Sequence, residues 1–211
     1  MSLKSLCKSL TGALLLLIPV FSYGQDRVLL DRFCRGVSQS CMEMSYTYSA
    51  RVSGVFNQGE GVLHSQGLMW KVKGNGVDMY CDSASVWIVD ASSKEVVIEP
   101  AAAEEPSQWL SNPALIFSRV DEMFVVNETL VSSDGKAVMY VLNPKESDDI
   151  DWLNLEIFKS DATVRRASVA FEDGTLIKIE VSSMKLTPKV SLEAFRPQTD
   201  FDSSWIVTDL R

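Results

Sequence analysis

The sequence predicts a mainly β fold of about eleven antiparallel strands with a few short helices. Three observations lead to this fold class. Apolar and polar residues alternate in short runs between residues 43 and 99 and again between residues 123 and 186, as they do in strands with one buried face. Gly-, Asn-, Asp- and Ser-containing turns separate the runs. The alternation stops once, in a proline-containing stretch near the middle of the chain. A sheet of this many strands must curl or close, and we expect the helices to cover its open side.

The first residues predict a secretory signal. Lys4 and Lys8 precede the apolar run "GALLLLIPVF", and the small residue Gly24 ends the pattern that favours cleavage. The run is shorter than the roughly 20 residues of a membrane-spanning helix. We therefore expect residues 1–24 to be a cleaved signal peptide and residues 25–211 to form a single domain.

The charge of the chain narrows the possible partners. The net charge is −8 with a sequence pI near 4.7, and removal of a signal with two lysines and no acid would make it −10 over 187 residues. Such a chain lacks the basic surface that nucleic acid requires, and its net charge disfavours adhesion to anionic lipid headgroups. Any lipid binding should therefore use an apolar site.

Three cysteines follow the predicted signal, namely Cys34, Cys41 and Cys81. In an oxidising compartment an odd number implies either one disulfide with a thiol left over or three buried thiols. Cys34 and Cys41 flank the short stretch "RGVSQS" and are the candidate disulfide pair. No metal site is expected, because His64 is the one histidine and no C-x-x-C motif occurs.

The first half of the mature chain predicts a helix followed by about six strands. Residues 26–38 place apolar side chains at helical spacing. Residues 43–56 alternate as one long strand, and we expect "NQGEG" at residues 57–61 to be the turn that follows. Further strands are predicted up to residue 99.

The mid-chain stretch from Ala101 to Val120 predicts one or two short helices, since its prolines forbid a continuing strand. Trp109, Leu115 and Phe117 give this stretch an apolar side. Short helices are marginal by themselves, so we expect this side to dock on the sheet as a lid. Five strands then follow, and the C-terminal residues predict a last strand with an extended tail.

Alternate positions of the predicted strands supply an apolar face. This face either is an ordinary core under the helices or accommodates an acyl chain, whose burial contributes about 0.8 kcal/mol per CH₂. The residues expected on the concave side are Tyr46, Tyr48, Leu68, Trp70, Val77, Met79, Trp87 and Val89.

Several motifs, in order and spacing, resemble the LolA-like family, the periplasmic carriers of outer-membrane lipoproteins. The matching stretches are "GEGVLHSQGLMWKV", "MYCDSASVWIVDASSKEVVIEP", "NPALIFSRV", "VAFEDGTLIKIEV" and "WIVTDLR". The resemblance implies an incomplete, strongly curved antiparallel β-barrel covered by an N-terminal helix and a mid-chain helical lid. It implies a periplasmic protein of a Gram-negative bacterium that binds the acyl chains of lipoproteins or another lipid. An inner-membrane lipoprotein-releasing complex and an outer-membrane acceptor would be its partners, and we expect a monomer.

One departure from the family concerns the lid. The family's Arg-Pro has no counterpart in "GVLHSQG" at residues 61–67, so we expect the lid to depend on apolar contact alone. An alternative function on the same fold is a lipid- or lipoprotein-sensing module of envelope-stress signalling. Catalysis and a cofactor are not expected, because His64 has no accompanying nucleophile motif and no phosphate-binding loop occurs.

Overall fold

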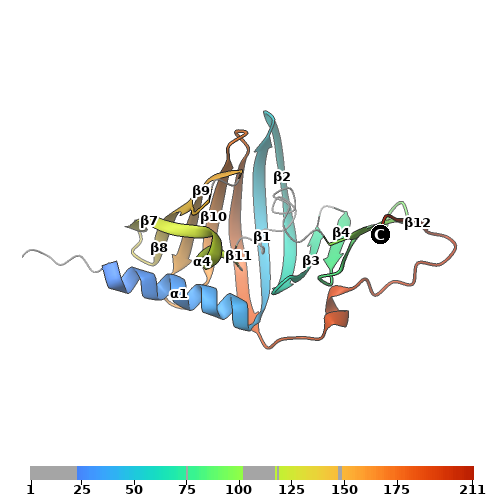
Figure 1. Ribbon diagram of the computed structural model, residues 1–211, viewed down its shortest axis with the longest axis horizontal. Coiled ribbons are helices and arrows are strands. Elements are labelled where there is room, and N and C mark those ends of the chain that lie inside the picture. The colour runs from blue at the N-terminus through green and yellow to red at the C-terminus, as the bar shows by residue number, and fades with distance from the viewer. Residues whose placement is uncertain (1–22, 75, 102–116, 118, 147–148) are drawn as a thin grey trace, which may run out of the picture.

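One twelve-stranded sheet dominates the computed structural model, which describes residues 23–74, 76–101, 117, 119–146 and 149–211. The strands follow the order β12-β6-β5-β4-β3-β2-β1-β11-β10-β9-β8-β7. All neighbouring strands are antiparallel except β12, which runs parallel to β6. The sheet is open and curved, with β7 and β12 at its two edges, so it is not a closed barrel (Figure 1).

The elements have the following bounds: α1 Tyr23–Gln39, β1 Cys41–Val52, β2 Val55–Gln66, β3 Met69–Gly74, β4 Val77–Cys81, β5 Ser85–Asp90, β6 Glu95–Pro100, α4 Val120–Met123, β7 Phe124–Val131, β8 Ala137–Pro144, β9 Ile150–Phe158, β10 Val164–Phe171, β11 Leu176–Thr187, the 3₁₀ helix η1 Leu192–Phe195, and β12 Ile206–Asp209. The predicted mainly β fold with an N-terminal helix is therefore confirmed. No helix among the described residues has both the length and the apolar character needed to cross a membrane.

The first hairpin differs from its prediction. Residues 43–56 do not form one strand, because the chain reverses at Ser53 and Gly54, whose φ angles are 48° and 81°. Two successive residues with positive φ form the tight turn that matches the twist of a hairpin. The stretch "NQGEG", predicted as a turn, lies within β2, where each of its residues has a partner in β1.

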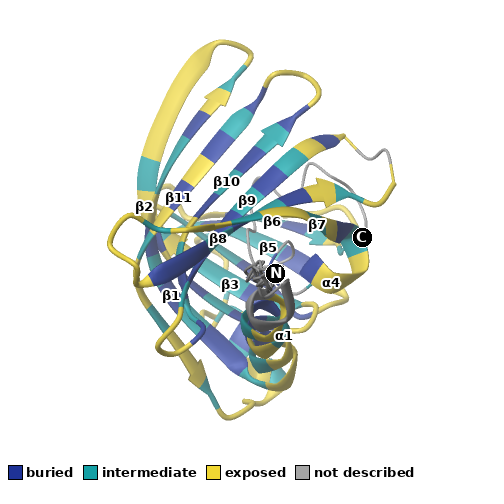
Figure 2. Ribbon diagram, turned by 90° about the vertical axis from the view of Figure 1, so that its left-hand side faces the viewer, coloured by how far each residue is buried: buried dark blue, intermediate teal, exposed yellow. Residues whose placement is uncertain are grey.

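The main core lies between the concave face of the sheet and α1. Leu30, Phe33 and Val37 of the helix are buried in the same cluster as residues from strands of both halves of the sheet. Figure 2 shows α1 nearly end-on within the curve of the sheet. The β1–β11 pair joins the two halves, since it unites a strand from the beginning of the chain with one near its end.

Candidate functional site

The concave face of β3–β6 carries a row of apolar side chains. In each successive pair of these strands one apolar residue lies directly opposite another, in the order Val72, Met79, Ile88 and Val97. Side chains at directly opposed positions share a face. All four are only half-buried. Leu63 of β2 extends this concave row and is fully buried. We call Val72, Met79, Ile88 and Val97 the concave row.

The other half of the concave face is filled by protein. Phe33 of α1 meets the ring of Phe117 edge to face, with 6.2 Å between the ring centroids. Both rings are buried, together with Val120 at the start of α4. Among the described residues, α1 and α4 occupy this side, whereas Val72, Met79 and Ile88 of the concave row pack half-buried at the margin of the same cluster.

The structure brings several predicted lipid-binding residues to this face. Tyr46 and Trp70 are buried in the main cluster, and Tyr48 and Met79 pack against it half-buried. Val77 is half-buried on the same face of β4, two residues from Met79. Phe117 belongs to the same cluster. The face is therefore continuous from β1 to β4.

One other predicted residue, Leu68, is not part of it. Leu68 lies in the turn before β3 and is 51% exposed. Trp109 and Leu115, expected in the lid, lie outside the described residues.

The prediction that Trp87 and Val89 share the concave face is wrong. Trp87 lies opposite Tyr80, and Val89 opposite Asp78, whereas the concave positions of β5 pair with Met79 and Cys81. Alternation along the strand therefore turns both residues to the convex face. There they belong to a second, smaller apolar cluster.

The C-terminal segment covers this second cluster, a role that the sequence motifs did not lead us to expect. Phe201 and Trp205 pack against the cluster, with 5.1 Å between their ring centroids. β12 then pairs with β6 along the edge of the sheet. The sequence did contain a signal, because "VWIV" in β5 is apolar at four consecutive positions and such a strand is covered on both faces.

Polar contacts fasten the C-terminal segment at two further points. The side-chain amide of Gln66 donates to the Val190 carbonyl at 3.1 Å and accepts from the Val190 N–H at 2.8 Å. The guanidinium of Arg196 lies 2.6 Å from the carboxylate of Asp82, which is 2% exposed. These contacts hold residues 188–211 around the β3–β6 half of the molecule.

The predicted Cys34–Cys41 disulfide is not formed, and Cys34, Cys41 and Cys81 are free thiols. Cys34 faces the main cluster beside Asp121 of α4, and burial, followed by the charge of Asp121, raises its pKa to about 12. Cys41 begins β1 opposite Thr187 on the face away from Met42, which is buried in the main cluster. The two thiols therefore point to different sides of the sheet.

Two titratable groups, Tyr46 of β1 and His64 of β2, have shifted pKa values. Burial, followed by the neighbouring Tyr48, raises the pKa of Tyr46 to about 12, so its ring stays neutral. On the convex face, burial, followed by the charge of Lys71, lowers the pKa of His64.

The concave row itself contains no ionisable side chain, whereas on the same face Asp90 lies opposite Val77 and Glu99 lies opposite Val86. Only the row is suited to hydrocarbon. Within the described ranges, no group of three or more His, Cys, Asp or Glu residues could hold a metal ion.

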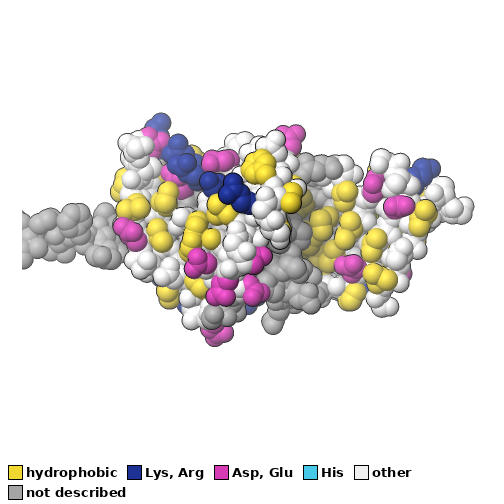
Figure 3. Space-filling view, turned by 90° about the horizontal axis from the view of Figure 1, so that it is seen from above, with side chains coloured by type: hydrophobic (Ala, Val, Ile, Leu, Met, Phe, Trp, Pro, Cys, Tyr) yellow, Lys and Arg dark blue, Asp and Glu magenta, His cyan; other side chains and the backbone are white. Residues whose placement is uncertain are grey.

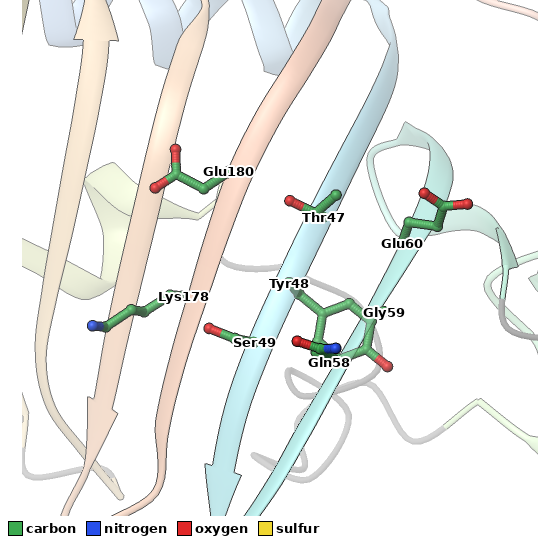
Figure 4. A pocket seen from close by; sticks show the side chains of 8 residues that line it. All are labelled: Thr47, Tyr48, Ser49, Gln58, Gly59, Glu60, Lys178 and Glu180. Atoms are coloured by element: carbon green, nitrogen blue, oxygen red, sulfur yellow. The ribbon is translucent and has the colours of Figure 1, made fainter.

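A hollow lies on β1, β2 and β11, and most of the residues that line it are polar or charged. It has a volume of about 510 Å³, and Figure 4 shows the eight residues that line it: Thr47, Tyr48, Ser49, Gln58, Gly59, Glu60, Lys178 and Glu180. Thr47 and Ser49 alternate with Tyr46 and Tyr48, so most of its side chains belong to the convex face. This hollow is separate from the concave row.

Comparison with solved structures finds several similar chains. An uncharacterized conserved protein from Thermus thermophilus is 13% identical, with a TM-score of 0.54 over 88% of this chain and 99% of that one. A LolA superfamily protein from Nitrosomonas europaea is 10% identical, with a TM-score of 0.44 over 81% and 97% of the two chains. MucB in the Pseudomonas aeruginosa MucA/MucB complex is 13% identical, with a TM-score of 0.34 over 82% and 61%.

No family model matches the sequence, and no curated protein matches it. The similarity to the Thermus protein shows a shared fold. A LolA superfamily protein, from the family that the sequence motifs resemble, is among these structural neighbours.

Proposed function

We propose that this protein binds acyl chains on the concave face of β3–β6 and carries lipid-modified cargo through the periplasm. The observation that carries the proposal is the concave row, in which Val72, Met79, Ile88 and Val97 cross four strands without a polar side chain between them. A soluble domain gains by covering such a face. The resemblance of the sequence motifs to lipoprotein carriers supports the same ligand class.

The dimensions of the concave row suit one acyl chain. Four strands at a spacing of about 4.8 Å make the row about 14 Å long. One leaflet contributes roughly 15 Å to the hydrocarbon core of a bilayer, so a single chain laid across the strands would contact all four side chains. Met79 lies inside the row, and the flexible thioether of methionine adapts to ligands of varied shape.

The direction of transport and the membrane partners belong to the same proposal. The predicted signal would deliver the mature chain to the periplasm, where a carrier would receive cargo from an inner-membrane lipoprotein-releasing complex and deliver it to an outer-membrane acceptor. Native mass spectrometry of the protein purified from periplasm should detect a bound acyl species. A protein that never carries one would contradict the carrier role.

A charge in the concave row tests the site itself. We expect Val72→Asp to lower the affinity for a fluorescent fatty acid by more than about tenfold, because the carboxylate would replace an apolar contact and face the hydrocarbon. Val131→Asp is the matched control, since Val131 is 61% exposed at the end of β7. Circular dichroism and the melting temperature report folding of both variants. Equal affinity of the two variants for the probe would exclude the concave row as the site.

A further inference from the structure

The tip of the β1–β2 hairpin exposes two large apolar side chains. Val55 is 61% exposed and Phe56 is 59% exposed. They directly follow the tight turn at Ser53 and Gly54. The hairpin is built from two twelve-residue strands and projects beyond the neighbouring turns of the sheet (Figure 1). Neither side chain contributes to a core cluster among the described residues.

The apolar character occurs on both faces of the hairpin. Phe56 lies opposite Arg51, and Val55 lies opposite Val52. Because successive residues of a strand point to opposite faces, Val55 and Phe56 project in opposite directions. A groove on a protein partner would contact one face of the hairpin, whereas a lipid layer entered by the tip would surround both.

The side chains of the convex face form layers that begin at this tip. The first layer, which we call the rim row, continues the pair of Phe56 and Arg51 through Leu176 and Ala170 to Trp152. Apart from Arg51, every member of the rim row is apolar or aromatic. Between its members lies a hollow of about 210 Å³ that Phe56, Leu176, Arg51 and Lys178 help to line.

Charge changes sign with distance from the tip. Lys178 lies opposite Ser49, one row below Arg51, and a further row below it Glu60 and Glu180 both lie opposite Thr47. Successive rows are about 7 Å apart, since two residues of a strand separate them. The order is therefore an apolar row that contains Arg51, then a row with Lys178, then a row in which carboxylates outnumber the single cation Arg166. Figure 3, which looks down on this end, shows Lys and Arg side chains beside exposed hydrophobic ones.

This order matches the layers of a phospholipid surface. Apolar and aromatic groups enter to a depth of about 5–10 Å at the boundary of headgroups and acyl chains, and basic side chains just above them meet the phosphates. The neighbouring β10–β11 turn carries Glu172 and the exposed Asp173, whose carboxylate accepts hydrogen bonds from the backbone N–H and the hydroxyl of Thr175. These acids restrict close contact to the β1–β2 side of the rim.

We propose that the tip of the β1–β2 hairpin docks on a phospholipid bilayer, with Val55 and Phe56 among the acyl chains and with Arg51 and Lys178 at the phosphates. The mature chain has a predicted net charge of −10, which would repel an anionic membrane from most of its surface and would orient the molecule with this tip toward the lipid. The tip is distinct from the concave row, so membrane docking does not depend on acyl-chain binding.

Flotation of the mature protein with lipid vesicles tests this docking. Wild type should float with vesicles of phosphatidylcholine mixed with phosphatidylglycerol. We expect the Val55→Asp/Phe56→Asp variant to lose about tenfold or more in partitioning, because two apolar side chains no longer enter the lipid. The Leu130→Asp/Val131→Asp variant is the matched control, since these residues are equally apolar and are 46% and 61% exposed at the other end of the molecule.

A charge reversal separates the electrostatic contribution of Arg51 and Lys178 from the insertion of the apolar side chains. Arg51→Glu/Lys178→Glu should weaken binding to the mixed vesicles and change binding to pure phosphatidylcholine little, because the cations act on lipid charge. A tryptophan placed by Phe56→Trp should be quenched by brominated acyl chains. Failure of the wild type to float, equal loss in the control variant, or the absence of quenching would each overturn the proposal. Fatty-acid affinity, measured without vesicles, should be unchanged in the tip variants.

Discussion

Asp82 connects the turn before β5 to the C-terminal segment. Its carboxylate accepts hydrogen bonds from the backbone N–H groups of Ala84 and Ser85, at 3.0 and 2.9 Å, and pairs with Arg196. Burial opposes ionisation of Asp82, but the N–H groups and the guanidinium together lower the pKa of its carboxyl below the ordinary value. The charged form is thus the one that the fold stabilises.

The lowered pKa of Asp82 determines how the stability of the protein depends on pH. A carboxyl whose pKa is lower in the folded state contributes stability that is present above its unfolded pKa of about 3.9 and is lost as the pH falls through its folded pKa. Asp82→Asn should lower the free energy of unfolding at neutral pH by about 1.5–3 kcal/mol, since hydrogen bonds to a charged group are lost. The variant should then lose less stability than wild type below pH 4.

Urea unfolding at neutral and acidic pH measures both effects. Asp31→Asn is the control, because Asp31 pairs with Arg27 at 3.0 Å on the exposed side of α1, where an ion pair contributes at most about 1 kcal/mol. If the two variants lose stability equally, the buried pair does not fasten the C-terminal segment.

At the scale of elements, α1 depends on one buried side of its surface. Phe33 is fully buried against Phe117, whereas Val28 of the same helix is 63% exposed. We expect Phe33→Ala to lower the free energy of unfolding by about 3–5 kcal/mol, because a large cavity would remain between α1 and the sheet. Val28→Ala should change it by less than about 0.5 kcal/mol. Denaturant midpoints compare the two, and similar midpoints would mean that α1 packs only loosely.

At the scale of the whole molecule, the open sheet ends in two edge strands, β7 and β12, which must not pair with other molecules. The β7 edge has a bulge between Val126 and Glu128, and such irregularities hinder pairing with another strand. Glu128 lies between Val125 and Leu130 on one face, as their partners in β8 indicate. A charge there interrupts an otherwise apolar edge.

We therefore expect the wild type to be a monomer and Glu128→Val to associate. Val125 and Leu130 are each 46% exposed, so the substitution would create a continuous apolar stripe along an edge strand. Light scattering coupled to gel filtration gives the mass of each. Glu128→Gln, which removes the charge without adding an apolar group, is the control. A stable dimer of the wild type would contradict the monomer prediction.

Local pattern determined much of the fold. Alternation and turn residues predict five of the strands after the mid-chain stretch, and helical spacing at residues 26–38 predicts α1, which spans Tyr23–Gln39. These signals are readable because each depends on residues within a few positions of one another. The prediction of the first hairpin is wrong for the same reason, since the short pair Ser53–Gly54 is a weaker local signal than the two glycines of "NQGEG".

The tertiary structure alone decided which faces meet. The sequence shows that Trp87 and Val89 share a face of their strand, but pairing with β4 decides that this face is convex. Whether Cys34 and Cys41 lie close enough to form a disulfide depends likewise on how α1 packs on the sheet. The concave row and the rim row each combine side chains from several strands of a sheet whose two halves are joined through β1 and β11. Periodicity is a local property, whereas register is set by long-range pairing and by the layer that covers each face, and a shift of one residue exchanges the faces.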